Sequence, residues 1–235
     1  MENDTLKLTG VLADPTRFSI YHYIVTNHQS VTVQEIADEF EIHPNVARLH
    51  LTKLEDVDLL SSTSEKTGKG GRPSRLYFLS EQVVNLQFPP RDYQLLATIA
   101  IETLLSLGEV GQKALDDMGL RFGQEAAKQA IDKEHLVLAR MSYEEKIETI
   151  RRVILAQGLN PEISIVDERT IRFRVFNCTF KETALKHPAS ICQMHHMLLI
   201  GIFQTFFGKD IQLIEENSIM SGCQSCDYTL LRLPE

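Results

Sequence analysis

The sequence lacks several features that would place it in other classes of protein. It contains no tryptophan, and no apolar run reaches the ~18 residues that a membrane-spanning helix requires. Its first five residues are acidic and polar, so they do not read as a signal peptide. No Ser/His/Asp set, phosphate-binding glycine loop or His-x-Glu metal motif is present. We therefore expect a cytoplasmic protein that is not an enzyme.

An excess of basic residues is also missing. The chain of 235 residues carries 24 Lys and Arg against 32 Asp and Glu, a formal charge of −8, and residues 1–80 hold eight basic against eleven acidic residues. The net charge of neither the chain nor its first 80 residues therefore indicates nucleic-acid binding. Positive charge is concentrated only locally, where Lys66, Lys69, Arg72 and Arg75 fall within ten residues without an acid between them.

Residues 1–56 show the pattern of several short helices. A helix is predicted over 15–27, after an Asp-Pro break that supplies a cap and a first helical residue. Its apolar stripe is wide enough for a buried helix and consists of Phe18, Ile20, Tyr21, Tyr23, Ile24 and Val25. Thr32 and Glu35 have the spacing of a capping box for a short helix over 33–40. A three-residue turn separates it from a helix over 44–56, which is the spacing of a helix-turn-helix.

A basic hairpin follows these helices. Leu59 and Leu60 enter a strand, residues 67–74 are rich in glycine and basic residues, and residues 76–79 return as a second strand. Helices followed by such a hairpin make a winged helix, so residues 1–80 are predicted to be a winged helix-turn-helix DNA-binding domain.

The helix over 44–56 is the predicted DNA reader, because the second helix of a helix-turn-helix enters the major groove. It offers His43, Asn45, Arg48, His50, Thr52 and Lys53. Its apolar positions, which are expected to face the core, are Val46, Leu49, Leu51, Leu54 and Val57. Asn suits adenine and Arg suits guanine, so Asn45 and Arg48 are the candidates for base contacts. Thr52, Lys53 and the wing residues Lys69, Arg72 and Arg75 are candidates for phosphate or minor-groove contacts. The alternative is a winged helix used for protein contacts.

A second, α+β domain is predicted beyond a linker over 81–90, which ends in Pro89-Pro90. Apolar patterns predict helices over 91–107, 109–131, 143–157 and 189–207, and strands over 163–166, 170–176, 211–215 and 228–233. We expect 91–235 to be a sensor and dimerisation domain, with the apolar helix 91–107 as its dimer surface. The helix 189–207 either packs the core or lines a pocket for an apolar ligand.

All four cysteines, Cys178, Cys192, Cys223 and Cys226, lie in the last quarter of the chain. In a reducing cytosol they favour a metal or redox site over disulfides. Four thiolates can close a tetrahedral zinc site or hold an iron-sulfur cluster, and the last two form a C-x-x-C. Cys178 and Cys192 can instead be small buried hydrophobes, and His187 or His195 can join a mixed site.

Two segments, Leu12-Ala13-Asp14-Pro15-Thr16-Arg17 and the wing Gly71-Arg72-Pro73-Ser74-Arg75-Leu76-Tyr77-Phe78-Leu79-Ser80, look like bacterial ArsR-type winged-helix regulators. Together with Phe88-Pro89-Pro90-Arg91-Asp92-Tyr93, Asn177-Cys178, Cys192 and Gly222-Cys223-Gln224-Ser225-Cys226, the chain resembles regulators related to the repressor of the Suf iron-sulfur assembly operon. That resemblance implies a homodimeric DNA-binding repressor with an iron-sulfur cluster on Cys178, Cys192 and Cys223 or Cys226.

The sequence therefore predicts a transcriptional regulator, expected to be a repressor, whose affinity for a double-stranded DNA operator is controlled by an iron-sulfur cluster or another thiolate-bound metal such as zinc. The alternative is a regulator that responds to a small molecule and carries a structural zinc or no metal. A thiol or metal enzyme with an incidental winged helix is the third and weakest reading.

Overall fold

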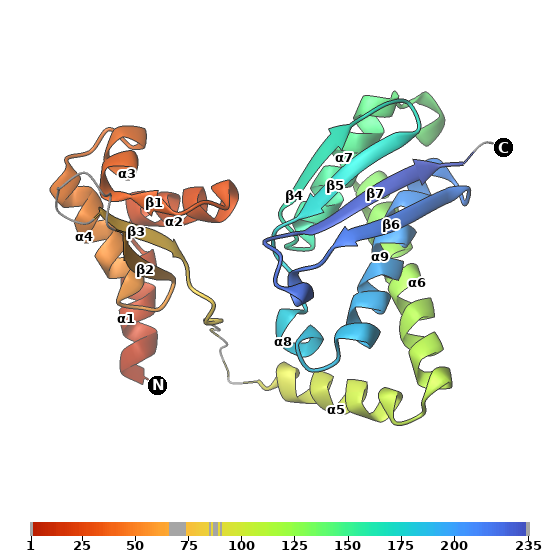
Figure 1. The fold of residues 1–235 in the computed structure, drawn as a ribbon, viewed down its shortest axis with the longest axis horizontal. Coiled ribbons are helices and arrows are strands. Elements are labelled where there is room, and N and C mark those ends of the chain that lie inside the picture. The colour runs from red at the N-terminus through yellow and green to blue at the C-terminus, as the bar shows by residue number, and fades with distance from the viewer. Residues whose placement is uncertain (1, 66–73, 85, 87–88, 90, 234–235) are drawn as a thin grey trace. The chain divides into compact units, whose positions relative to one another are not determined.

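The computed structural model describes residues 2–65, 74–84, 86, 89 and 91–233. The chain divides into two compact units, Met1–Arg91 and Asp92–Glu235 (Figure 1). The first unit is a helix-turn-helix with a β-hairpin, and the second combines helices with an antiparallel sheet. The predicted fold class is therefore confirmed. No helix in the described ranges is long and apolar enough to cross a membrane.

The first unit is built from four helices, whose starts are fixed by local caps. They are α1 (Glu2–Leu12), α2 (Pro15–Asn27), α3 (Val33–Glu39) and α4 (Pro44–Glu55). Asp14 Oδ1 accepts the backbone N–H of Arg17 at 2.9 Å, which starts α2. The Thr32 and Glu35 capping box starts α3, as predicted.

A small sheet completes the first unit. Its strands are β1 (Val31–Thr32), β2 (Leu60–Glu65) and β3 (Ser74–Leu79), in the order β1-β3-β2. β2 and β3 form the hairpin expected of a wing. The hairpin tip, including Lys66, Lys69 and Arg72, lies outside the described residues.

The core of the first unit is narrower than the apolar pattern of α2 implied. Ile20 and Ile24 are buried against Ile36 of α3 and Leu51 of α4. Phe18, which we assigned to the same apolar stripe, is 52% exposed. The stripe was too wide because α2 is covered on one side only, so an apolar residue a half-turn away remains at the surface.

The second unit carries a four-stranded antiparallel sheet covered on one face by helices. Its helices are α5 (Tyr93–Leu105), α6 (Glu109–Lys133), α7 (Tyr143–Ala156), α8 (Lys181–Ala184) and α9 (Pro188–Phe207), with short 3₁₀ turns at Leu138–Arg140 and Ile219–Ser221. The strands are β4 (Pro161–Ile165), β5 (Thr170–Val175), β6 (Ile211–Asn217) and β7 (Cys226–Arg232), in the order β4-β5-β7-β6. Figure 1 shows α6, α7 and α9 on one side of this sheet.

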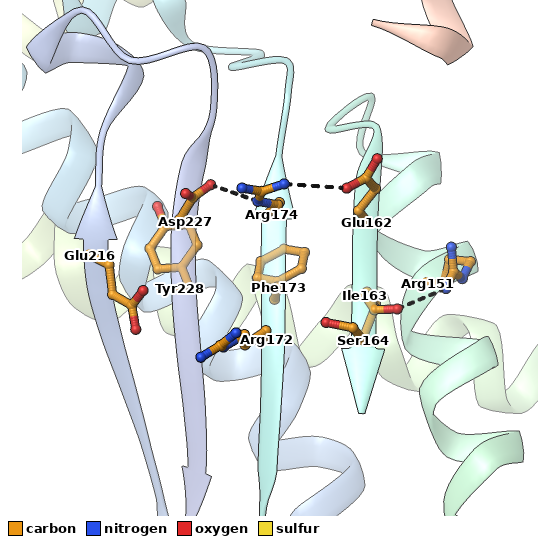
Figure 2. Close-up of a pocket in the computed structure, with 10 residues that line it drawn as sticks. All are labelled: Arg151, Glu162, Ile163, Ser164, Arg172, Phe173, Arg174, Glu216, Asp227 and Tyr228. Atoms are coloured by element: carbon orange, nitrogen blue, oxygen red, sulfur yellow. Dashed lines mark hydrogen bonds and ion pairs between the residues drawn. The ribbon is translucent and has the colours of Figure 1, made fainter. Parts of the chain in front are cut away.

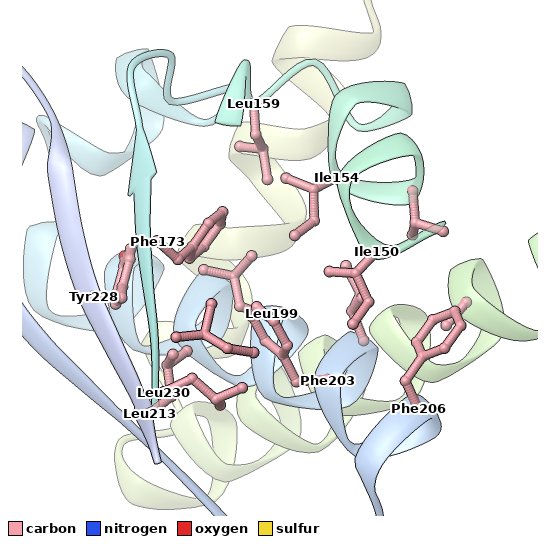
Figure 3. Packing of buried hydrophobic residues seen from close by; sticks show 14 of the residues in the cluster. Ile150, Ile154, Leu159, Phe173, Leu199, Phe203, Phe206, Leu213, Tyr228 and Leu230 are labelled. Carbon is pink, nitrogen blue, oxygen red and sulfur yellow. The ribbon is translucent and has the colours of Figure 1, made fainter. Parts of the chain in front are cut away.

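The main core lies between the sheet and these helices (Figure 3). Alternate residues of β5 point inward, so Phe173 is buried while Arg172 and Arg174 lie on the open face. The Phe173 ring stacks on Tyr228 and meets Phe203 edge-on, with ring centroids 5.7 Å apart in both pairs. The apolar residues of α9 thus pack the core, which was one of the two roles expected for this helix; the other was to line a pocket for an apolar ligand.

Helices α6 and α9 are in backbone contact along a seam of glycines. A methyl group added at Gly119 would overlap the carbonyl oxygen of Met194, and one at Gly123 would overlap that of Leu198. Gly201 of α9 is similarly close to the Leu120 carbonyl of α6. Glycine is required at these positions because any side chain would separate the two helices.

Helix α5 is poorly covered, since none of its residues is buried. The expected helix over 91–107 ends early, because Gly108 has a positive φ of 62° and reverses the chain into α6. His187, just before α9, lies 2.9 Å from a carboxylate oxygen of Glu102 and so fastens α5 to the start of α9.

Candidate DNA-reading face and thiol cluster

The start of α4 is organised by the residue before it. His43 is the N-cap, and its Nδ1 accepts the backbone N–H of Asn45 at 3.2 Å. Pro44 occupies the first helical position, where its missing N–H has no cost. His43 therefore has a structural role in the turn, and the first side chains that α4 presents to the outside are those that follow Pro44.

One face of α4 is buried and the other is open. Ala47, Leu51 and Leu54 are fully buried in the core of the first unit, and His50 is 7% exposed. Burial lowers the pKa of His50, against the opposing charge of Asp14, so this ring is neutral and turned inward. Our inclusion of His50 among the outward-facing side chains of the helix was wrong.

The open face of α4 carries four neighbouring side chains in its first two turns. Asn45 and Arg48, the predicted base readers, are both exposed. Val46 and Leu49, which we assigned to the apolar core of this helix, are 41% and 54% exposed. The available signal was the helical period: these two residues lie away from the stripe of Ala47, Leu51 and Leu54.

The remaining DNA-contact candidates differ in their surroundings. Lys53 is exposed and its Nζ lies 3.8 Å from Asp56, while Thr52 is half-buried. Arg75 donates to both carboxylate oxygens of Glu55 and, through Nε, to Ser62 Oγ at 2.7 Å. It therefore fastens the base of the hairpin to the end of α4. Lys69 and Arg72 lie outside the described residues, so they stay predictions.

The four cysteines come from four different segments, and all are free thiols. Cys178 lies in the loop after β5, and Cys192 is in the second turn of α9. Cys226 is the first residue of β7, paired in register with Val175. Cys223 is exposed in the loop that precedes it, after Gly222 with φ 87°. The C-x-x-C thus spans the junction of a loop and a strand instead of a single turn.

Three of these thiols share one electrostatic environment. Burial raises the pKa of Cys178, and nearby Cys226 adds to the shift. Burial, Glu215, Cys178 and Cys226 together raise the pKa of Cys192 to about 11. The thiolate forms of Cys178 and Cys192 are therefore disfavoured, and both thiols are protonated at neutral pH. Glu215 was missed from the sequence because only the pairing of β6 with β7 brings it here.

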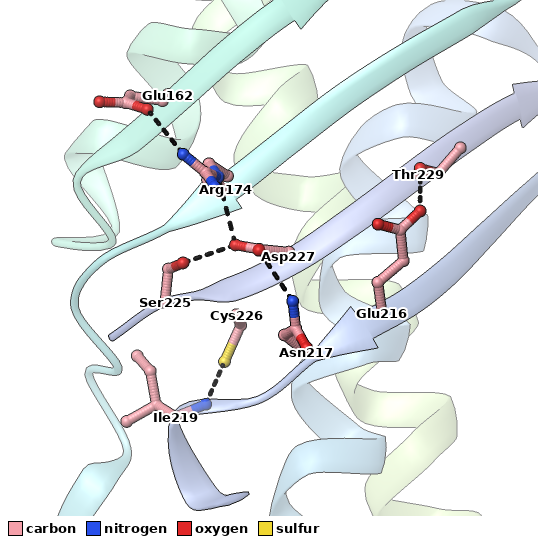
Figure 4. A network of polar contacts seen from close by, with 9 residues as sticks. All are labelled: Glu162, Arg174, Glu216, Asn217, Ile219, Ser225, Cys226, Asp227 and Thr229. Atoms are coloured by element: carbon pink, nitrogen blue, oxygen red, sulfur yellow. Dashed lines mark hydrogen bonds and ion pairs between the residues drawn. The ribbon is translucent and has the colours of Figure 1, made fainter. Parts of the chain in front are cut away.

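The neighbourhood of Cys226 is held by a polar network (Figure 4). The backbone N–H of Ile219 donates to Cys226 Sγ at 3.3 Å. The adjacent Asp227 accepts from Ser225 Oγ and from Asn217 Nδ2, and Arg174 lies 3.4 Å away. Burial raises the pKa of Asp227, but these hydrogen bonds and the Arg174 charge outweigh it, so the pKa is lowered. These contacts therefore hold the end of the loop that leads into β7.

The cysteines do not form a ready ligand set as placed. Among the residues that the structure describes, no group of three or more His, Cys, Asp or Glu side chains is arranged to hold a metal ion. Cys192, Glu215 and Cys223 do line one shallow depression of about 440 Å³. His187 is instead bonded to Glu102. The assignment of the four thiols as metal ligands stays a prediction.

His195 is the most isolated polar group in this region. It is 7% exposed, its ring meets Phe180 edge-on at 5.3 Å, and its buried Nε2 has no hydrogen-bond partner within the described part of the chain. Burial and nearby His196 lower the pKa of His195 to about 4, so the ring is neutral. A buried nitrogen without a partner is costly, and it is available to a ligand that can hydrogen-bond.

The open face of the sheet contains a wider hollow of about 670 Å³ (Figure 2). Figure 2 shows Arg174 between Asp227 and Glu162, which lie 3.4 and 3.9 Å from its nitrogens. Arg174 balances only one of the two carboxylates, so the trio carries one net negative charge, and the hollow is polar and open. It is less suited to a small apolar ligand than an enclosed cavity.

Comparison with known proteins gives two findings for the first unit. Residues 12–63 match the family described as "Helix-turn-helix domain". Over 78 residues, the chain is 35% identical to an uncharacterized HTH-type transcriptional regulator of Methanocaldococcus jannaschii. The match covers 33% of this chain and 78% of the relative.

Two solved structures are distantly similar in fold. One is the phenol-responsive sensory domain of the transcription activator PoxR, with a TM-score of 0.48, 17% identity, and coverage of 79% of this chain and 89% of that one. The other is subunit 3 of a trafficking protein particle complex from Naegleria fowleri, covalently bound to palmitic acid, with a TM-score of 0.42, 12% identity, and coverage of 61% and 93%. Both are too remote to transfer a property.

The open face of α4, the hairpin that follows it, and the sequence match to the archaeal regulator agree on one type of protein. Proteins of this type bind DNA and control transcription, and they are not enzymes. The chain belongs to the helix-turn-helix transcriptional regulators.

Proposed function

We propose that this regulator is a homodimeric repressor of the ArsR-like group, related to the repressor of the Suf operon, whose C-terminal unit controls operator affinity through a thiolate-bound metal. The observation that carries the DNA-reading part is the open face of α4. Asn45 and Arg48 stand on its first two turns, where the recognition helix of a helix-turn-helix reaches base edges.

Each predicted contact has a distinct task. Asn45 reads adenine and Arg48 reads guanine through paired hydrogen bonds in the major groove. Thr52 and Lys53, further along α4, bind phosphates. Lys69, Arg72 and Arg75 of the hairpin contact the backbone or the minor groove, which requires Arg75 to exchange Glu55 for a phosphate.

The dimer is proposed to form through α5, the turn that follows it and the start of α6. Large apolar side chains there are more than half exposed: Tyr93, Leu95, Leu96, Ile99, Leu107 and Val110. Pairing of two copies along this face would remove these side chains from water, and a standard interface of this kind covers ~800 Å² per partner. Two-fold symmetry would also match a palindromic operator.

An iron-sulfur cluster, or zinc as the alternative, is the proposed effector on Cys178, Cys192, Cys223 and Cys226. Its support is the mutual proximity of the three half-buried thiols and the backbone N–H that Ile219 donates to Cys226 Sγ, a type of bond that tunes thiolate ligands. Cys223 would complete the set only after its loop moved toward Cys192, since no ligand group is assembled among the described residues.

The cofactor is tested on protein purified without oxygen. An absorbance spectrum with iron, sulfide and zinc analysis is expected to find a cluster or zinc in the parent chain and neither in the variant with Cys178→Ser and Cys226→Ser. DNA selected from random duplexes is then titrated with the loaded protein and with protein treated with a chelator. A colourless parent protein with no metal, or equal DNA affinity with and without metal, contradicts control by a metal.

A second candidate is a regulator that responds to a small molecule, with a structural zinc or no metal. The observation in its favour is His195, whose buried Nε2 lacks a partner within the described residues. In that case the variant with Cys178→Ser and Cys226→Ser loses stability but keeps its response to the molecule, whereas His195→Phe abolishes the response.

A further inference from the structure

Two apolar side chains interrupt the polar surface of α4 at its reading end. Val46 and Leu49 are 41% and 54% exposed, and they lie three residues apart, on one face of the helix. Asn45 and Arg48, also exposed, border them along the same two turns. The core side of α4 is already filled by Ala47, Leu51 and Leu54, so the fold itself does not use Val46 or Leu49.

We propose that Val46 and Leu49 read thymine by contact with its C5-methyl group. This inference rests on the proposed use of α4 as the recognition helix. Thymine is the base that presents an apolar group in the major groove of unmodified DNA, and apolar side chains at the start of a recognition helix are placed to meet it. Exposed Val and Leu have no hydrogen-bonding group, so they cannot contact phosphate or the other base edges favourably.

The arrangement also predicts the kind of sequence that is read. Hydrogen-bonding and apolar side chains alternate along the open face: Asn45, Val46, Arg48 and Leu49. Each half-site should therefore contain thymines next to the adenine read by Asn45 and the guanine read by Arg48. Removal of one thymine methyl should weaken binding roughly fourfold, as expected for the loss of one buried carbon.

The test replaces thymine by deoxyuridine, which removes only the methyl group. A duplex selected with the full-length wild-type protein is resynthesised with single uracils, and dissociation constants are measured by fluorescence anisotropy at fixed salt. At one or two positions of each half-site, uracil should cost the wild type about fourfold. The same replacement should cost Val46→Ala or Leu49→Ala less than the wild type at its own position, because the shorter alanine side chain loses most of its contact with the methyl group.

Leu155→Ala is the matched control, since Leu155 is 54% exposed on α7 in the other unit. It should keep the full sensitivity to uracil. If every uracil duplex binds the wild type as the parent duplex does, or if Val46→Ala and Leu49→Ala stay as sensitive as the wild type, the inference is wrong.

Arg48→Ala separates this inference from the proposed reading face. If Arg48→Ala loses binding but uracil substitution does not change the affinity of the wild type, the role of Val46 and Leu49 is wrong and the reading face on α4 is still supported. Undiminished binding by Arg48→Ala, or failure of the wild type to select any duplex, overturns the reading face and with it the methyl contacts. Circular dichroism of each variant verifies that the fold is kept.

Discussion

Glu102 and His187 are hydrogen-bonded at 2.9 Å, although 85 residues separate them in the chain. The bond joins the third turn of α5 to the residue that caps α9. Because Cys192 lies one turn further into α9, the proposed dimer helix and the thiol cluster are linked through one pair of side chains.

Loss of this bond should loosen α5. Glu102 is 54% exposed, so the bond is screened by water and Glu102→Ala should cost only about 0.2–1 kcal/mol. We expect faster amide hydrogen exchange across α5 in Glu102→Ala, measured by mass spectrometry, because α5 has no buried residue to hold it otherwise. Asp210→Ala, which removes another exposed acid, is the control. Equal exchange in both variants would show that the bond does not restrain α5.

The dimer surface can be tested by charge. Leu96 and Ile99 are 61% and 55% exposed on α5, and their joint replacement by Glu should turn the dimer into a monomer in light scattering after gel filtration. Val137→Glu, at a residue 51% exposed elsewhere in the same unit, should leave the dimer intact. A wild-type monomer at micromolar concentration would argue against α5 as a self-association face.

Replacing glycine by alanine should change the free energy of unfolding in opposite directions inside and outside the glycine seam. Gly123→Ala should lower the free energy of unfolding by about 1–3 kcal/mol, because its methyl group overlaps the Leu198 carbonyl and forces α6 and α9 apart. Gly10→Ala, in α1, meets no atom within 4 Å and should raise stability by about 0.5–1 kcal/mol through its helix propensity. Urea unfolding of the two variants measures both changes. An unchanged free energy of unfolding in Gly123→Ala would mean that α6 and α9 can separate at no cost.

The two kinds of DNA contact on α4 should respond differently to salt. Arg48→Ala should cost about 1–3 kcal/mol of binding free energy and relax the sequence preference at one base pair. Lys53→Ala should weaken binding to all duplexes alike and reduce the slope of log affinity against log salt by about 1. Anisotropy titrations between low and moderate salt measure both. A uniform loss in Arg48→Ala would assign it to phosphate instead of a base.

The thiols should differ in reactivity when no metal is bound. Cys223 is exposed and should be alkylated first by iodoacetamide. Cys192 should react slowest, since with a pKa of about 11 about one thiol in a thousand is ionised at pH 8. Its rate should rise about tenfold for each pH unit up to that pKa. Peptide mass spectrometry follows each site, and early labelling of Cys192 would contradict its burial.

Local signals in the sequence predicted local structure well. The caps of α2 and α3 use side chains within three residues of the helix start, so Asp14 and Thr32 could be identified as caps without knowledge of the rest of the fold. The β4–β5 hairpin was similarly visible because its strands alternate and adjoin. These features depend on neighbours in the chain.

The features that were missed depend on distant partners. β1 has two residues and exists through its pairing with β3, in which Val31 faces Tyr77. The outward position of Leu49 follows from the elements that cover the other side of α4, and its apolar character pointed the wrong way. Glu215 reaches the thiols only through the β6–β7 pairing. Periodicity marks a helix, but the covering elements decide which apolar face is buried.

At its glycines, the seam between α6 and α9 brings backbone into contact with backbone. No side chain at these positions can change its rotamer to absorb a small shift. Gly111 continues the same contact toward α5, where it lies against the Leu104 carbonyl. Helices α6 and α9 therefore form a stiff pair, and backbone contact attaches α5 to this pair where its last turn meets Gly111. A displacement imposed at the first turns of α9 would reach α5 through that turn and through the Glu102–His187 bond.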